Sequence, residues 1–136
     1  MSTRALYTFN DGHDNITVYK HWDGYPEKRG GYGFIANAML YAWELPRFEA
    51  DDFAAAFVAA NKKEGGGDIR LTTESTTNGD VLGLAYWYTI TLEGKRLKVE
   101  CRDLWGGADL PAVYIDKAGK VIMPDGQVVE PAELPL

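Results

Sequence analysis

The sequence has a single cysteine, Cys101, and no long apolar run. One cysteine excludes an internal disulfide and a zinc site built from several thiolates. No segment approaches the roughly 18 consecutive apolar residues of a membrane-spanning helix, so we do not expect an integral membrane protein. Residues 1–7 also lack the apolar core of a secretory signal peptide. These absences together favour an intracellular, cytoplasmic protein.

Basic residues are fewer than acidic ones, with 14 Lys and Arg against 20 Asp and Glu and a net charge of −6. Non-specific affinity for nucleic acid comes from neutralising phosphates, so we do not expect direct binding to DNA or RNA. Acidic residues outnumber basic ones most clearly over 103–136, which suits either a nucleic-acid mimic or a charge that only maintains solubility.

The composition is that of an ordinary globular chain, with 136 residues, 46% of them hydrophobic and 25% charged. A chain of this length can form one hydrophobic core without a disulfide or a metal. We therefore predict a single α+β domain over 1–126. The remaining residues, 127–136, include Pro131 and Pro135 and are predicted to form a loose C-terminal tail.

Two periodicities divide the chain. Alternation of apolar and polar residues predicts strands over 4–9, 15–21, 69–74, 81–92, 97–104, 112–115 and 120–123. Helical spacing predicts helices over 32–44, ending before Pro46, and over 49–62. The order β-β-α-α-β-β-β plus a short terminal hairpin segregates strands from helices. It predicts an antiparallel sheet with the two helices packed on one face.

The loop between the second strand and the first helix is unusually rich in aromatic, basic and glycine residues. We predict a ligand-binding site made of Lys20, His21, Trp22, Asp23, Tyr25, Lys28, Arg29 and Tyr32. The cations and the histidine would hold phosphate, the aromatic rings would stack on a base or sugar, and the aspartate would accept hydrogen bonds from hydroxyl groups. Free amides at the following helix start would suit an anion, and the glycines at 30, 31 and 33 would allow close approach.

A purely structural loop is the alternative interpretation. Asp23-Gly24 and Tyr25-Pro26 are ordinary turn formers, and the glycines after Arg29 match no dinucleotide fingerprint.

Other candidate sites are weaker. His13 and His21, with Asp11, Asp14 and Asp23, have no established metal-ligand spacing, so we predict no metal and no cofactor. Cys101 lies at an inward-facing strand position and is expected to be a small buried hydrophobe, so we predict no catalytic residue. An outward row of Arg70, Trp87, Lys98 and Arg102 is expected to be a solvated sheet face with cross-strand ion pairs; a partner surface is the alternative.

The first half of the chain resembles a group of small proteins encoded by phages and prophages. The resemblance is carried by residues 4–9, 18–26, 42–48 and the helix that ends at 61–62, above all by the run Lys-His-Trp-Asp-Gly-Tyr-Pro at 20–26. It implies the cytoplasm of a bacterial host and a role in blunting host defence. One strategy of small proteins in this setting is to sequester a cyclic-nucleotide or ADP-ribose-derived signal, usually as oligomers, and another is to bind a defence enzyme directly.

We therefore expect a non-enzymatic accessory protein that sequesters a small phosphate-bearing nucleotide signal of host defence, and that forms a homo-oligomer to enclose it. The alternative is an acidic protein inhibitor, a nucleic-acid mimic, that binds a host defence protein such as a CRISPR effector. An enzyme of unrecognised chemistry and a structural protein of the virion remain further alternatives.

Overall fold

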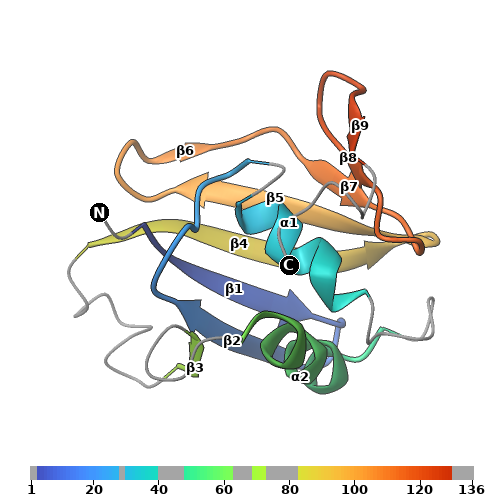
Figure 1. The fold of residues 1–136 in the computed structure, drawn as a ribbon, viewed down its shortest axis with the longest axis horizontal. Helices are drawn as coiled ribbons and strands as arrows, with labels where there is room; N and C mark the ends of the chain where they lie inside the picture. Colours follow the sequence, from blue (N-terminus) through green and yellow to red (C-terminus); the bar gives the residue numbers. More distant parts are fainter. Residues whose placement is uncertain (1–2, 28–29, 40–47, 63–68, 73–82, 130–136) are drawn as a thin grey trace.

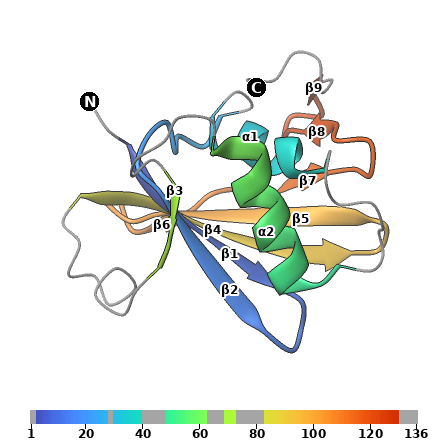
Figure 2. The same cartoon turned by 60° about the horizontal axis from the view of Figure 1, so that its bottom comes forward.

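The computed structural model describes residues 3–27, 30–39, 48–62, 69–72 and 83–129. The fold is α+β, as predicted, with helices α1 (Gly31–Ala38) and α2 (Ala50–Asn61) and a mostly antiparallel open sheet of nine strands (Figure 1). Both helices cover the same face of the sheet (Figure 2). In the residues described, neither helix is long and apolar enough to cross a membrane.

The sheet has the order β3-β2-β1-β4-β5-β7-β8-β9, with β6 beside β5. Its strands are β1 (Arg4–Asn10), β2 (Asn15–Lys20), β3 (Ile69–Leu71), β4 (Leu84–Glu93), β5 (Arg96–Asp103), β6 (Ala108–Asp109), β7 (Val113–Ile115), β8 (Val121–Ile122) and β9 (Val128–Val129). Strands β1 and β2 form an antiparallel hairpin, and the short terminal hairpin that the sequence predicts is confirmed as β7–β8. β1 and β4 pair in parallel, which the long intervening chain with both helices makes possible.

Aromatic side chains fill the space between the sheet and the helices. Strand alternation places Tyr7 and Phe9 on the helix-covered face, where Tyr7 stacks on Tyr88 with ring centroids 4.7 Å apart. Phe57 of α2 contacts Tyr7 at 4.6 Å and Phe9 at 5.5 Å. These rings, with Phe53 and Tyr32, form a set that we call the core aromatics. Their interlocking fixes both helices on the sheet.

A buried asparagine pair joins the two helices. The Asn37 side-chain amide donates to Asn61 Oδ1 at 3.2 Å, and the Asn61 amide donates to the carbonyl oxygens of Phe34 and Phe57. Because buried polar groups are costly unless hydrogen-bonded, this arrangement specifies one register between α1 and α2.

The turn between β1 and β2 caps the start of α2. Asp11 Oδ2 accepts a hydrogen bond from the Ala50 amide at 2.9 Å, while Oδ1 accepts from the amides of His13 and Asp14. These backbone donors stabilise the carboxylate and lower the pKa of Asp11 to about 2. Asp11, which the sequence analysis considered as one member of a weak metal-ligand cluster, therefore caps helix α2.

The C-terminal part of the sheet differs from the prediction. Val128 and Val129 pair with β8, and Val129 is buried, so the sheet continues beyond residue 126 where a loose tail was expected to start. Two apolar residues were too short a run to be recognised as a strand. Strand β6 was also not predicted. Residues 130–136, and 40–47 of the predicted first helix and its end, lie outside the described residues.

Candidate functional site

The loop that leaves β2 is anchored to the core at Gly24. The Gly24 amide donates to the Thr3 carbonyl at 2.9 Å, and the buried Tyr88 hydroxyl donates to the Gly24 carbonyl at 2.6 Å. A Cβ atom at this position would lie 2.6 Å from the Cβ of Ala5, so only glycine allows the loop to lie this close to β1. The base of the loop is therefore fixed in place.

The start of α1 is closed by the same loop. The Gly31 amide donates to the Tyr25 carbonyl at 2.7 Å, and the amides of Gly30 and Tyr32 donate to the Glu27 carbonyl. The sequence analysis expected these amides to be free to bind an anion, but they donate to carbonyl oxygens of the loop instead. A Cβ at Gly31 would collide with the Tyr88 ring and hydroxyl, so this glycine serves packing against the core.

Two of the predicted site residues lie inside the protein. Lys20 is 3% exposed and its ammonium lies 4.2 Å from the centroid of the Phe34 ring. Tyr32 is 2% exposed and meets Tyr88 edge to face at 5.6 Å. Burial raises the pKa of the Tyr32 hydroxyl well above its ordinary value. Neither side chain is presented to a ligand in solution.

Three other predicted residues do reach the surface. Trp22 is 47% exposed, Tyr25 is 39% exposed, and Asp23 between them is exposed with a left-handed φ of 58°. Aspartate tolerates this conformation better than most residues, and the resulting turn directs the two rings outward. The two remaining basic residues of the predicted site, Lys28 and Arg29, lie outside the described residues.

His21 forms the support behind the tryptophan. Its Nδ1 atom is hydrogen-bonded to the Tyr19 hydroxyl at 2.6 Å, and its ring meets Trp22 at right angles with centroids 4.5 Å apart. This chain of contacts runs from β2 to the exposed indole and restricts the rotamer of Trp22.

A further exposed aromatic residue was missed by the sequence interpretation. Trp105 is 76% exposed on the turn between β5 and β6. Asp103 Oδ1 accepts hydrogen bonds from the Trp105 amide at 2.9 Å and from the Gly106 amide at 3.0 Å, which is the geometry of an Asx turn. The run Asp-Leu-Trp-Gly-Gly at 103–107 is the signal that could have located it, since such turns lie at the surface.

The loop and this turn lie at the same end of the sheet, in the left half of Figures 1 and 2. Tyr86 connects them, because it pairs with Asp103 across β4 and β5 and also lies near Tyr25 and Glu27. Partial burial raises the pKa of the Tyr86 hydroxyl, and the charges of Asp103 and Glu27 raise it further.

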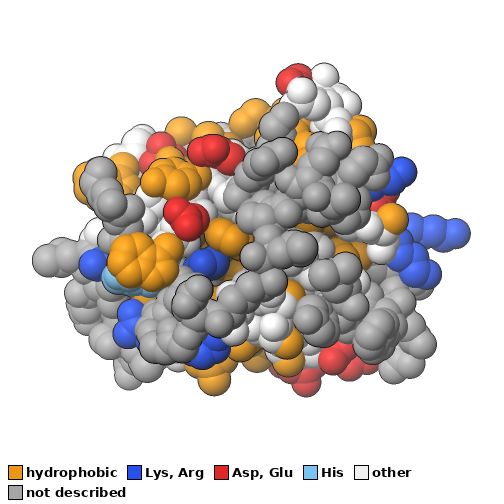
Figure 3. Space-filling view, in the orientation of Figure 1, with side chains coloured by type: hydrophobic (Ala, Val, Ile, Leu, Met, Phe, Trp, Pro, Cys, Tyr) orange, Lys and Arg blue, Asp and Glu red, His pale blue; other side chains and the backbone are white. Residues whose placement is uncertain are grey.

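We call Trp22, Tyr25 and Trp105 the aromatic end. They are the large aromatic side chains that are exposed in the part of the chain that the structure describes. Figure 3 shows hydrophobic side chains gathered at the left of this face, with acidic and basic side chains between them. Asp23 and Glu27, both exposed, add negative charge beside the rings.

Two kinds of reactive site, a metal site and a cysteine nucleophile, can be checked in the described residues. No group of three or more His, Cys, Asp or Glu among them is placed to hold a metal ion. Cys101 is buried, as predicted, and burial raises the pKa of its thiol to about 12. A thiol of that pKa does not supply the thiolate that a nucleophile needs near neutral pH.

Comparison with protein-family models, curated proteins and solved structures finds no match to this chain. The resemblance to phage-encoded proteins therefore stays a prediction, and a functional conclusion depends on the geometry of the chain itself.

Proposed function

We propose that this protein is a non-enzymatic binding protein that docks on another protein through its aromatic end. The observation that carries the proposal is that Trp22, Tyr25 and Trp105 are all exposed on a loop and a turn that lie at one end of the sheet. Tryptophan and tyrosine are enriched at the energetic centres of protein interfaces. Their rings give large contact areas with few rotatable bonds, so little conformational entropy is lost on binding.

The loop is also held in shape before it meets a partner. Hydrogen bonds at Gly24 and Gly31 tie its backbone to Thr3, Tyr25 and the buried Tyr88. A surface that is already ordered avoids much of the entropy cost of association.

The exposed carboxylates of this end favour a basic partner. Asp23 and Glu27 flank the rings, and the whole chain carries a net charge of −6. Acidic groups around an apolar centre accelerate encounter with a positively charged surface and disfavour acidic partners. This agrees with the acidic-inhibitor hypothesis, in which a host defence protein is the partner.

Sequestration of a small phosphate-bearing nucleotide is the second candidate. It is favoured by the outward-facing ring of Trp22, on which a base could stack, and by Lys28 and Arg29 close by in the sequence. Against it, Lys20 is buried and the amides at the start of α1 are engaged. We therefore rank the protein partner first.

Quantitative affinity capture from a bacterial lysate tests the first proposal. The wild-type chain is compared with the double variant W22A/W105A and with L71A, which removes an exposed side chain from the edge strand β3. We expect one protein to be retained by the wild type and by L71A, lost with W22A/W105A, and released at high salt. Equal retention by all three baits would contradict a role for the aromatic end.

Titration calorimetry with cyclic nucleotides and ADP-ribose tests the second candidate. Binding heat that is lost in W22A and kept in W105A would favour nucleotide capture. The absence of heat with every nucleotide would count against it. Light scattering with and without the nucleotide then tests the predicted homo-oligomer.

A further inference from the structure

The outer face of the sheet, opposite the helices, carries a shallow groove. Its volume is about 330 Å³ and it is lined by Trp87, Thr89, Glu100, Cys101, Arg102, Asp109 and Leu110. The cross-strand ion pairs predicted for this face are confirmed, with Arg102 against Asp109 at 2.9 Å and Lys98 near Glu93 at 4.0 Å. A volume at the lower end of the range for ligand pockets suits one long side chain.

One wall of the groove is an indole whose orientation is fixed. Trp87 Nε1 donates to Thr8 Oγ1 at 2.8 Å, and the hydroxyls of Thr8 and Thr17 are hydrogen-bonded at 2.7 Å. These contacts cross three neighbouring strands, β4, β1 and β2. The plane of the indole is therefore set before any molecule enters the groove.

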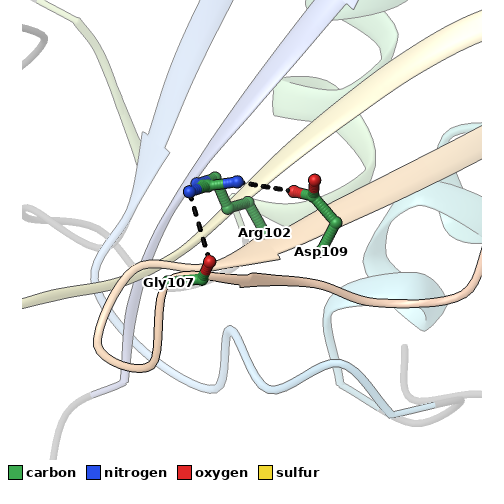
Figure 4. Close-up of polar contacts among 3 residues, drawn as sticks. All are labelled: Arg102, Gly107 and Asp109. Atoms are coloured by element: carbon green, nitrogen blue, oxygen red, sulfur yellow. Dashed lines mark hydrogen bonds and ion pairs between the residues drawn. The ribbon is translucent and has the colours of Figure 1, made fainter.

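The positive charge in the groove is already neutralised. Arg102 donates one hydrogen bond to Asp109 Oδ1 at 2.9 Å and another to the Gly107 carbonyl at 3.2 Å (Figure 4). Its guanidinium is thereby held at the edge of the sheet by β6 and the turn before it.

Among the charged residues that line the groove, Glu100 is the one left after Arg102 and Asp109 neutralise each other. It is exposed, and among the residues that the structure describes its carboxylate makes no ion pair and no side-chain hydrogen bond. It lies opposite Thr89, so it is a diagonal neighbour of Trp87, which lies opposite Arg102. Diagonal neighbours on one face of a sheet are within reach of a shared side chain. The groove thus combines an aromatic face with one negative charge.

We propose that this groove binds an arginine side chain of a partner protein, with the guanidinium stacked on Trp87 and hydrogen-bonded to Glu100. A planar guanidinium can stack and donate to a carboxylate at once, whereas an ammonium group is a more strongly hydrated point charge. Charge complementarity selects a cation, because Arg102 and Asp109 cancel and Glu100 remains. The site uses none of the residues of the aromatic end.

Nuclear magnetic resonance of the ¹⁵N-labelled full chain tests the proposal with three blocked tripeptides that differ only at the middle residue: arginine, lysine or citrulline. We expect the arginine peptide to shift the indole N–H resonance of Trp87 in a saturable way. Citrulline, which has the same shape without the charge, should bind about tenfold more weakly, a change of roughly 1.4 kcal/mol. Lysine should fall between them.

Two variants with the same charge change make the result specific. E100Q should weaken binding of the arginine peptide about tenfold, while D52N, on the exposed side of α2, should leave it unchanged. Citrulline binding as tightly as arginine, lysine binding more tightly, no shift at Trp87, or equal effects of E100Q and D52N would each overturn the proposal. W22A/W105A should still bind the arginine peptide. The proposal for the groove and the proposal for the aromatic end can therefore be refuted independently.

Discussion

The core aromatics and the aromatic end both use large aromatic side chains, tyrosine among them, for opposite purposes. Tyr7, Phe57 and Tyr88 are completely buried, and the Tyr7 ring contacts the rings of Phe57 and Tyr88 at 4.6 and 4.7 Å. Tyr25, Trp22 and Trp105 are 39%, 47% and 76% exposed. Side-chain chemistry alone therefore does not separate a core residue from a binding residue in this protein.

The position of each residue in the backbone separates the core aromatics from the aromatic end. Tyr7 and Tyr88 lie on paired strands at positions that face the helices. The exposed rings lie on a loop and a turn whose backbones are held by hydrogen bonds: Gly24 is bonded to Thr3 and Tyr88, and Asp103 closes the β5–β6 turn. Each exposed ring thus stands on a fixed base but lacks a second layer of structure over it. That combination is typical of interaction surfaces.

The largest expected change in the free energy of unfolding comes from truncating a side chain of the core aromatics. Phe57→Ala removes a fully buried ring that contacts both Tyr7 and Phe9. We expect the free energy of unfolding to fall by about 3–5 kcal/mol, the usual cost of deleting a buried aromatic side chain. Urea denaturation followed by circular dichroism measures it. A loss below about 1 kcal/mol would contradict the role assigned to the core aromatics.

The second prediction concerns the Tyr88 hydroxyl, which joins a core aromatic residue to the loop that carries Trp22 and Tyr25. Tyr88→Phe keeps the buried ring but leaves the Gly24 carbonyl without the donor now 2.6 Å away. We expect a loss of about 1–3 kcal/mol, together with faster hydrogen exchange of the Gly31 amide at the start of α1, which is bonded to the loop at Tyr25. Tyr114→Phe, at a half-buried position on β7, is the matched control and should change stability by less than about 0.5 kcal/mol. Equal effects of the two substitutions would show that the loop does not depend on Tyr88.

Much of the fold is predictable from local pattern. The alternation over 4–9, 15–21 and 81–92 is a strong signal, and strands β1, β2 and β4 lie close to the predicted positions. The parallel pairing of β1 with β4 and the two-residue strand β9 are set by long-range packing instead. A run of two valines carries no period, so β9 could not be recognised in advance.

The site was less predictable, for a physical reason. Lys20 shares the inward-facing alternation of Val18, so strand geometry places it under Phe34 although its charge suggested a phosphate ligand. The burial of Tyr32 depends on Tyr88, which lies 56 residues later in the sequence. The turn of Trp105 has a local signal at 103–107, but only the fold places this turn at the same end of the sheet as the loop of Trp22.

The third prediction separates charge from packing at the helix cap. Asp11→Asn removes the carboxylate that accepts from Ala50 on one oxygen and from His13 and Asp14 on the other. An asparagine has only one accepting oxygen, so one set of bonds is lost and the variant should be less stable at neutral pH.

The pH dependence has a definite sign. The pKa of Asp11 is lowered from 3.8 to about 2 on folding, so its stabilisation is present above pH 3.8 and is lost as the pH falls through 2. The difference in the free energy of unfolding between wild type and D11N should therefore narrow from pH 5 to pH 2 in denaturation experiments. Glu100→Gln, which removes an exposed carboxylate with the same charge change, should show no such narrowing. A gap that is constant with pH would exclude an electrostatic contribution from the cap.

The smallest expected effect is at the aromatic end itself. Trp22→Ala and Trp105→Ala each remove an exposed ring, so the free energy of unfolding should change by no more than about 0.5 kcal/mol. Trp105 should show the smaller change of the two, because His21 packs against Trp22. Leu71→Ala, exposed at 73% on the edge strand, gives the reference for an exposed apolar side chain with no assigned role.

Together with the Phe57 variant, these substitutions decide whether the two groups of aromatic residues are distinct. If Trp105→Ala costs more than about 1.5 kcal/mol, its ring contributes to folding and the aromatic end is an extension of the core. If stability is unchanged and capture of the partner protein is lost, the ring contributes to binding and not to folding. The second outcome is the one that a rigid base with an uncovered ring predicts, because contact area that is not buried within the chain remains available to a partner.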